Sequence, residues 1–138
     1  MNKYFIFYQR THDIDWFFQY EGKYYHVASN GGKIPDIINK KINREIQHLL
    51  SLENDVCDAE YVIQNPENLD YSSFFEFAKK GFISIDRKDG LFEEQHYYTV
   101  AIPSNGCNPS SSIAEKIPSL DPKDFNIDID NYHRIDNR

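Results

Sequence analysis

The first 28 residues alternate between apolar runs and short polar breaks, a pattern that predicts β-strands. Residues 4–8 form a continuous aromatic and aliphatic run without helix-capping residues, so we expect a strand buried on both faces in the middle of a sheet. Aromatic residues fill 16–20 and 23–28 on either side of a short turn at Glu21 and Gly22. Aromatic runs that flank a glycine turn are typical of a β-hairpin.

Residues 34–52 carry apolar side chains at helical spacing and predict the longest helix of the chain. These side chains recur every three or four positions, at Ile34, Ile37, Ile38, Ile42, Ile46, Leu49 and Leu50. Pro35 suits the first turn of a helix, where its missing N–H leaves no hydrogen bond unmade. We therefore expect an amphipathic helix over 34–52 that covers one face of the sheet and supplies much of the core.

The middle of the chain predicts a short strand, a second helix and a second hairpin. Residues 61–63 are β-like, and the apolar spacing that begins at Tyr71 indicates a helix over 70–80. The carboxylate of Asp70 is placed to accept an N–H group of the first turn of that helix. Residues 82–85 and 95–102 are strand-like runs on either side of a charged loop, so we expect them to pair.

The composition changes after Pro103, where loop-forming residues dominate. Residues 113–117 have the pattern of one helical turn. Residues 126–130 alternate like an edge strand, and an acidic tail explains the same residues equally well. We interpret residues 1–103 as one α+β domain and 104–138 as a loop-rich acidic extension packed on it.

The fold class predicted from these elements is α+β. We expect a single-layer antiparallel or mixed sheet of five to six strands. The long helix 34–52 lies on one face, and the shorter helix 70–80 packs beside it or at an edge. A chain of 138 residues is long enough to bury a core without further support.

Charge is unevenly distributed along the chain, whose net charge is −7. The first 52 residues carry seven Lys/Arg and five Asp/Glu, and the remainder carries eight Lys/Arg and seventeen Asp/Glu. Such an acidic chain disfavours binding to nucleic acid and favours a protein partner with a basic surface. The candidate surface for that partner is acidic and comprises Glu53, Asp55, Asp58, Glu60, Glu93 and Glu94.

The two cysteines, Cys57 and Cys107, lie fifty positions apart and form no CxxC motif. We expect two free thiols in a reducing cytoplasm, with a single disulfide as the alternative in an oxidising compartment. No apolar run is long enough for a signal sequence or a membrane span. The sequence therefore predicts a cytoplasmic protein that does not bind membranes.

One polar cluster in the first third is the candidate pocket. Its members are His12, Asp13, Asp15, Trp16, His26, Asn30, Gly31, Gly32 and Lys33. Two carboxylates and two imidazoles are able to hold a metal ion or to act as an acid–base pair, but a polar turn explains them as well. We assign no catalytic residue, metal or cofactor to it.

The glycine loop of this cluster is not a P-loop. Val27 stands where the GxxxxGK[ST] motif needs a glycine, and Ile34 stands where it needs Ser or Thr. Free N–H groups before a helix can cradle an anion, yet a strand-to-helix connection that needs positive φ accounts for the same residues. No GxSxG elbow and no cysteine-protease signature is present either.

The leading functional hypothesis is a non-enzymatic binding protein, in the form of an inhibitor of a basic partner. It rests on the acidic second part of the chain, the ten tyrosines and the missing catalytic motifs. A second hypothesis is a small metal-dependent or acid–base hydrolase that uses His12, Asp13, Asp15 and His26. A third is a homo-oligomeric scaffold, for which a homodimer is the simplest form.

Overall fold

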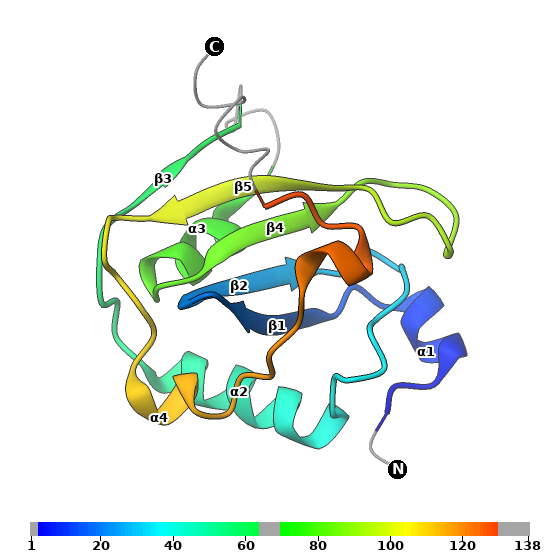
Figure 1. Cartoon of the computed structure of the whole chain (residues 1–138), viewed down its shortest axis with the longest axis horizontal. Coiled ribbons are helices and arrows are strands. Elements are labelled where there is room, and N and C mark those ends of the chain that lie inside the picture. Colours follow the sequence, from blue (N-terminus) through cyan, green and yellow to red (C-terminus); the bar gives the residue numbers. More distant parts are fainter. Residues whose placement is uncertain (1–2, 64–69, 130–138) are drawn as a thin grey trace.

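The computed structural model describes residues 3–63 and 70–129, and its centre is one mixed sheet. The strands lie in the order β1-β2-β4-β5-β3 (Figure 1). Their bounds are β1 Asp15–Tyr20, β2 Lys23–Ala28, β3 Ala59–Tyr61, β4 Ile83–Arg87 and β5 Tyr97–Pro103. Among these five strands, β2 and β4 pair in parallel, and the other neighbouring pairs are antiparallel. The predicted α+β class with a single mixed sheet is confirmed.

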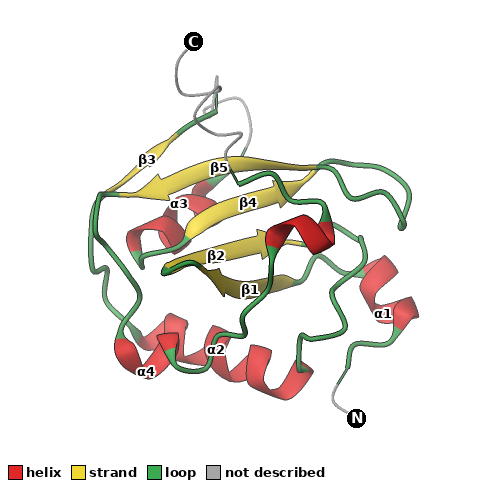
Figure 2. Cartoon of the chain, viewed as in Figure 1, coloured by secondary structure: helices red, strands yellow, loops and turns green. Residues whose placement is uncertain are grey.

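Helices and the C-terminal segment cover both faces of the sheet (Figure 2). The helices are α1 Ile6–Thr11, α2 Lys40–Leu52, α3 Ser72–Lys79 and α4 Ser111–Ala114, with a 3-10 helix at Pro122–Phe125. The first face carries Trp16, Phe18, Tyr25, Val27, Ile83 and Ile85. These side chains pack under Tyr4, Ile34, Ile38, Phe125 and Ile127.

The second face carries the alternate side chains of the same strands and is covered by α2, α3 and α4. Phe17 packs there with Ile46 and Leu50 of α2 and with Ile113 of α4. Phe74 and Ala78 of α3 cover the half of the face that β4 and β5 form. The period of two along β1 and β2 thus divides the aromatic side chains between two apolar layers.

The predicted central strand at residues 4–8 is wrong, because α1 occupies most of this segment. Tyr4 is 7% exposed and Gln9 is buried, whereas Phe5 and Phe7 are 77% and 78% exposed. The side-chain amide of Gln9 donates to the carbonyl of Tyr4 (2.9 Å), and its oxygen accepts the N–H of Ile34 (2.9 Å). These bonds turn the segment into a short helix with one buried side.

The predicted helix 34–52 is shorter than expected, because α2 begins at Lys40. Asn39 caps it by accepting the N–H of Ile42 at 3.0 Å. Ile34 and Ile38 are buried, but they lie in a turn before the helix, where the N–H of Ile38 donates to the carbonyl of Pro35. Helical spacing in this turn was therefore not evidence for a helix.

Most of the other predicted elements agree with the structure to within two residues. The hairpin β1–β2, the helix α3 and the pair β4–β5 are confirmed, and β3 lies two residues before the strand predicted at 61–63. The helical turn predicted at 113–117 overlaps α4, which begins two residues earlier and ends at Ala114. The edge strand predicted at 126–130 does not form over 126–129, where Asn126 adopts a φ of 59°, and residue 130 lies outside the described residues.

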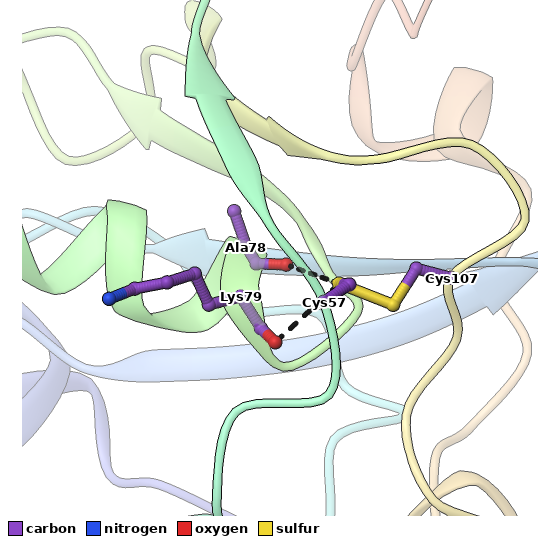
Figure 3. Close-up of a disulfide and its surroundings, with 4 residues drawn as sticks. All are labelled: Cys57, Ala78, Lys79 and Cys107. Atoms are coloured by element: carbon purple, nitrogen blue, oxygen red, sulfur yellow. Dashed lines mark hydrogen bonds between the residues drawn. A yellow bond between two sulfur atoms is a disulfide. The ribbon is translucent and has the colours of Figure 1, made fainter.

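Cys57 and Cys107 form a disulfide, so the prediction of two free thiols is wrong (Figure 3). Their Cα atoms are 6.2 Å apart, a distance that suits the bond. The pairing of β3 with β5 brings them together, because the N–H of Ser104 donates to the carbonyl of Asp58 at 2.9 Å. The sulfur of Cys57 also lies 3.5 Å from the carbonyl oxygen of Lys79 at the end of α3.

No helix in residues 3–63 and 70–129 has both the length and the apolar character needed to cross a membrane.

Candidate functional site

An open cleft of about 440 Å³ lies at the edge of the sheet where β2 and β4 end. Adjacent parallel strands place their carboxyl ends at the same edge, and crevices at such edges are common ligand sites. Residues of the loops that follow the two strands line the cleft together with residues at the start of α3 and at the start of β5. The lining residues are Asp13, Asn30, Asp70, Tyr71, Phe74, Asp86, Arg87, Lys88, Asp89 and Tyr98.

The cleft is acidic, and burial shifts the pKa of its carboxyl group Asp86 upward. Burial raises the pKa of the half-buried Asp86 carboxyl to about 6, although the hydrogen bond from Tyr98 acts in the opposite direction. The negative charge of Asp13 raises that pKa further. The hydroxyl of Tyr98 donates to Oδ2 of Asp86 at 2.8 Å and lies 2.9 Å from the hydroxyl of Tyr71. Asp86 is thus a partly desolvated carboxyl group that forms no ion pair among the described residues, although the backbone N–H of Arg87 and the imidazole of His26 also act to lower its pKa.

The basic side chain nearest in sequence, Arg87, serves the loops and not the carboxylates. Arg87 is 1% exposed, and its guanidinium donates to the backbone carbonyls of Asn30 (3.1 Å), Glu94 (2.8 Å) and Leu91. Gly32 makes room for it, because a Cβ at Gly32 would lie 2.5 Å from Cζ of Arg87 and closer still to Nε. Arg87 therefore ties the loop after β2 to the β4–β5 loop.

Asn30 fixes the wall of the cleft formed by the loop after β2. Its N–H donates to Oδ1 of Asp13 (2.9 Å), and its side-chain amide donates to Oδ1 of Asp89 (2.7 Å) and to the carbonyl of Arg87 (3.1 Å). Asn30 adopts a φ of 45°, which asparagine tolerates better than most residues. Two members of the predicted pocket, Asp13 and Asn30, therefore line the cleft.

Asp15, His26 and Ser84 form a hydrogen-bonded row on the second face of the sheet, next to the cleft. Nε2 of His26 lies 2.7 Å from Oδ1 of Asp15, and Nδ1 lies 2.6 Å from Oγ of Ser84. The ring of Phe77 stacks on the imidazole at 3.8 Å between centroids. His26 and Ser84 are fully buried, so a substrate has no access to the serine. The row joins β1, β2 and β4, and it presents no nucleophile.

The other predicted pocket residues lie elsewhere. His12 is exposed and stacks on Tyr8 at 3.8 Å. Trp16 is fully buried on the first face, where its Nε1 has no hydrogen-bond partner among the described residues. Gly31 has a φ of 75° and packs against the backbone of Arg10. A Cβ added at Gly31 would lie 3.2 Å from the carbonyl oxygen of Arg10. Lys33 is exposed. The nine residues therefore do not form one pocket.

The predicted acidic surface is also divided. Asp55 forms ion pairs with Lys79 (3.5 Å) and Lys80 (3.2 Å), which lowers the pKa of its carboxyl group. Glu53 accepts a hydrogen bond from Ser110 in the same region. Glu94 instead lies in the β4–β5 loop and accepts the N–H of Leu91 at 2.6 Å. Asp58, Glu60 and Glu93 are exposed. The six residues thus lie toward opposite ends of β4.

Sequence reasoning missed most of the cleft. Asp86 falls in the predicted charged loop after 82–85, whereas in the structure it is the half-buried residue of β4. The alternation of apolar and polar residues over 83–86 was the available signal. Asp70 does accept the N–H of Ser72 as predicted, and its position at the cleft follows from where α3 begins. Tyr71 and Tyr98 gave no signal beyond being aromatic. Among the described residues, no three His, Cys, Asp or Glu side chains are arranged to hold a metal ion.

No protein-family model, curated protein or solved structure matches this chain.

Proposed function

We propose that this chain is a non-enzymatic binding protein whose cleft receives a cationic side chain of a basic protein partner. The observation that carries the proposal is the state of Asp86. Its carboxyl group is half-buried, its pKa is raised to about 6, and it forms no ion pair among the described residues. A guanidinium or ammonium group placed beside Asp86 favours the ionised carboxylate and offsets the repulsion from Asp13.

Preorganisation makes this site more favourable than an exposed carboxylate. Folding has already removed part of the water around Asp86, so that part of the desolvation cost does not arise when the partner binds. Tyr98 holds Oδ2 by a hydrogen bond and so fixes the orientation of the carboxyl group toward the incoming cation. Tyr71 and Phe74 add aromatic walls against which an arginine or lysine stem packs.

The charge of the whole chain supports the same class of partner. Asp70 and Asp89 add two exposed carboxylates at the rim of the cleft. Complementary charge raises the rate of encounter with a basic protein and penalises acidic competitors. An inhibitor that covers the basic active site of another protein is one form of this function, and such an inhibitor needs no catalytic residue.

Peptide binding followed by NMR tests the proposal. The probe is an acetylated, amidated pentapeptide with one central arginine, and its control replaces arginine by citrulline, which has the same shape without the charge. We expect the arginine peptide to shift the amide signals of Asn30 and residues 86–89, with a weak Kd in the millimolar range (about −4 kcal/mol). Binding should weaken with salt and tighten between about pH 5 and 7, as Asp86 ionises.

Two carboxylate variants decide whether the cleft is responsible. Asp86→Asn removes the charge and should abolish the shifts. Asp124→Asn removes an exposed carboxylate from the 3-10 helix on the first face, and it should leave them unchanged. Equal binding of the citrulline peptide, or unaltered arginine binding by the Asp86→Asn protein, would show that the cleft does not recognise a cation.

A further inference from the structure

Three consecutive large apolar side chains are exposed at the start of α1. Phe5, Ile6 and Phe7 are 77%, 61% and 78% exposed. The fold leaves them no inward position, because Tyr4 and Gln9 occupy the buried side of this segment. An exposed run of this length is unusual on a soluble domain and marks a binding surface more often than a solvated one.

The apolar surface continues onto the segment that leads into α2. Nζ of Lys40 lies 5.8 Å from the centre of the Phe5 ring, so the starts of α1 and α2 are neighbours (Figure 1). Ile37 and Ile42 are 52% and 39% exposed there. Both border a shallow groove of about 70 Å³ between the start of α2 and Pro118. We call Phe5, Ile6, Phe7, Ile37 and Ile42 the N-terminal apolar surface.

Basic side chains occur on the segments that carry this surface. Lys40 lies over the Phe5 ring, and Lys33 and Lys41 are exposed on the loop after β2 and on α2. The guanidinium of Arg10 instead lies over the ring of Phe92, 4.4 Å from its centre. Asp36 is the acidic side chain that the segment 33–41 contributes. The local charge is therefore positive, whereas the cleft and the chain as a whole are negatively charged.

We propose that the N-terminal apolar surface docks a protein segment that combines bulky apolar side chains with carboxylates. Charge complementarity selects the occupant, because carboxylates pair with the basic rim while apolar side chains cover the phenylalanines. A second copy of this chain would oppose two basic rims, and a net charge of −7 opposes approach to an anionic lipid surface.

The exposed area fits a weak and reversible contact. Side chains of this size present about 150–250 Å² each when fully exposed, so Phe5, Ile6 and Phe7 offer roughly 400 Å² of apolar surface. Both partners together would bury about 800 Å² there, and the contact with Ile37 and Ile42 brings the total toward the lower limit of specific interfaces, about 1,000 Å². The inference does not depend on the cation-binding cleft.

Selection from a random 12-residue peptide library displayed on phage tests this proposal. Wild-type protein is the target, and selected peptides are then measured by fluorescence anisotropy against variants. We expect peptides enriched in Phe, Leu or Trp together with Asp or Glu. They should bind the Phe5→Ser/Phe7→Ser protein at least tenfold more weakly and Lys40→Glu several-fold more weakly. Leu52→Ser removes a comparably exposed apolar side chain at the end of α2, and it should have no effect.

Melting temperatures of the variants should match that of the wild type, because the changed side chains are exposed.

Several outcomes would overturn the proposal. Peptides without acidic residues, or selected peptides that bind Phe5→Ser/Phe7→Ser as tightly as the wild type, exclude an acidic segment at this surface. Basic peptides that compete with the arginine probe would point to the cleft alone. A concentration-dependent dimer, or flotation with anionic vesicles, that disappears in the double variant would identify a different occupant.

Discussion

Replacement of Gly32 by alanine tests whether the buried Arg87 guanidinium holds the two cleft loops together. The φ of Gly32 lies outside the left-handed region, so alanine is compatible with the backbone at this position. The added Cβ would lie 2.5 Å from Cζ of Arg87, well inside van der Waals contact. Because the backbone allows the substitution, the change in the free energy of unfolding measures the effect of displacing Arg87 alone.

The expected loss follows from the hydrogen bonds that Arg87 makes. The guanidinium donates to the carbonyls of Asn30, Leu91 and Glu94, and a hydrogen bond to a charged group contributes about 1.5–3 kcal/mol. If displacement breaks the equivalent of one to two of these bonds, Gly32→Ala lowers the free energy of unfolding by about 3 kcal/mol. For a chain of this length that corresponds to a fall of about 10 °C in Tm.

Urea unfolding followed by tryptophan fluorescence measures this loss. Trp16 is the single tryptophan and is fully buried, so its emission reports the core directly. Gly22→Ala is the matched control, because an added Cβ there meets nothing within 4 Å while the φ of 77° is unfavourable for alanine. We expect that control to cost about 1 kcal/mol from backbone strain alone.

A double-mutant cycle with Arg87→Ala decides the cause. Removal of the Arg87 side chain leaves space for the new methyl group, so Gly32→Ala should cost less than about 0.5 kcal/mol in that background. A loss of about 3 kcal/mol in both backgrounds would refute the steric argument, since the clash partner is absent from one of them. A loss no larger than that of Gly22→Ala in the wild-type background would refute it as well.

Three further predictions concern single groups. The pKa of Asp86 is about 6 in the folded protein, against an ordinary value of 3.8. The contribution of Asp86 to the free energy of unfolding therefore falls as the pH rises from about 4 to 6. Asp86→Asn should remove this fall, and urea midpoints measured across that pH range test it. Cys57→Ser/Cys107→Ser opens a loop of 50 residues and should cost about 4 kcal/mol, and thiol titration of the denatured, unreduced wild type should find no free thiol. His26→Leu leaves two buried or half-buried polar partners unpaired and should cost about 2–3 kcal/mol in urea unfolding.

The elements that sequence predicted correctly are those in which local pattern and tertiary contact agree. The turn at Gly22 has the positive φ that its sequence implies, and the runs on either side pair in register from Asp15 with Ala28 to Tyr20 with Lys23. The run at residues 4–8 misled because apolar character alone does not report burial. What places this segment in a helix is the bond of Gln9 to Ile34, and a contact between positions 25 apart leaves no local signal.

The cleft was only half predictable for a similar reason. Asp13 and Asn30 lie in loops adjacent to the first hairpin, so their proximity follows from a pairing that the sequence indicates. Asp86 and Asp89 join them only because β4 pairs in parallel with β2, with Ala28 opposite Asp86. A parallel pair needs a long crossover, and its register is set by packing of the intervening helices and not by a turn.

That parallel pair also explains why the two proposed binding surfaces differ in charge. The loop that leaves β2 runs from Asn30, at the acidic cleft, to Lys33 and then to the start of α2, at the basic apolar surface. The buried Arg87 anchors this loop from the β4 side, so one guanidinium supports the structure between the two sites. If both surfaces bind partners as proposed, Gly32→Ala should weaken peptide binding at the cleft even where the protein stays folded, whereas Leu52→Ser should affect neither surface. If the Gly32→Ala protein binds the arginine peptide as tightly as the wild type, binding at the cleft does not depend on the position of Arg87.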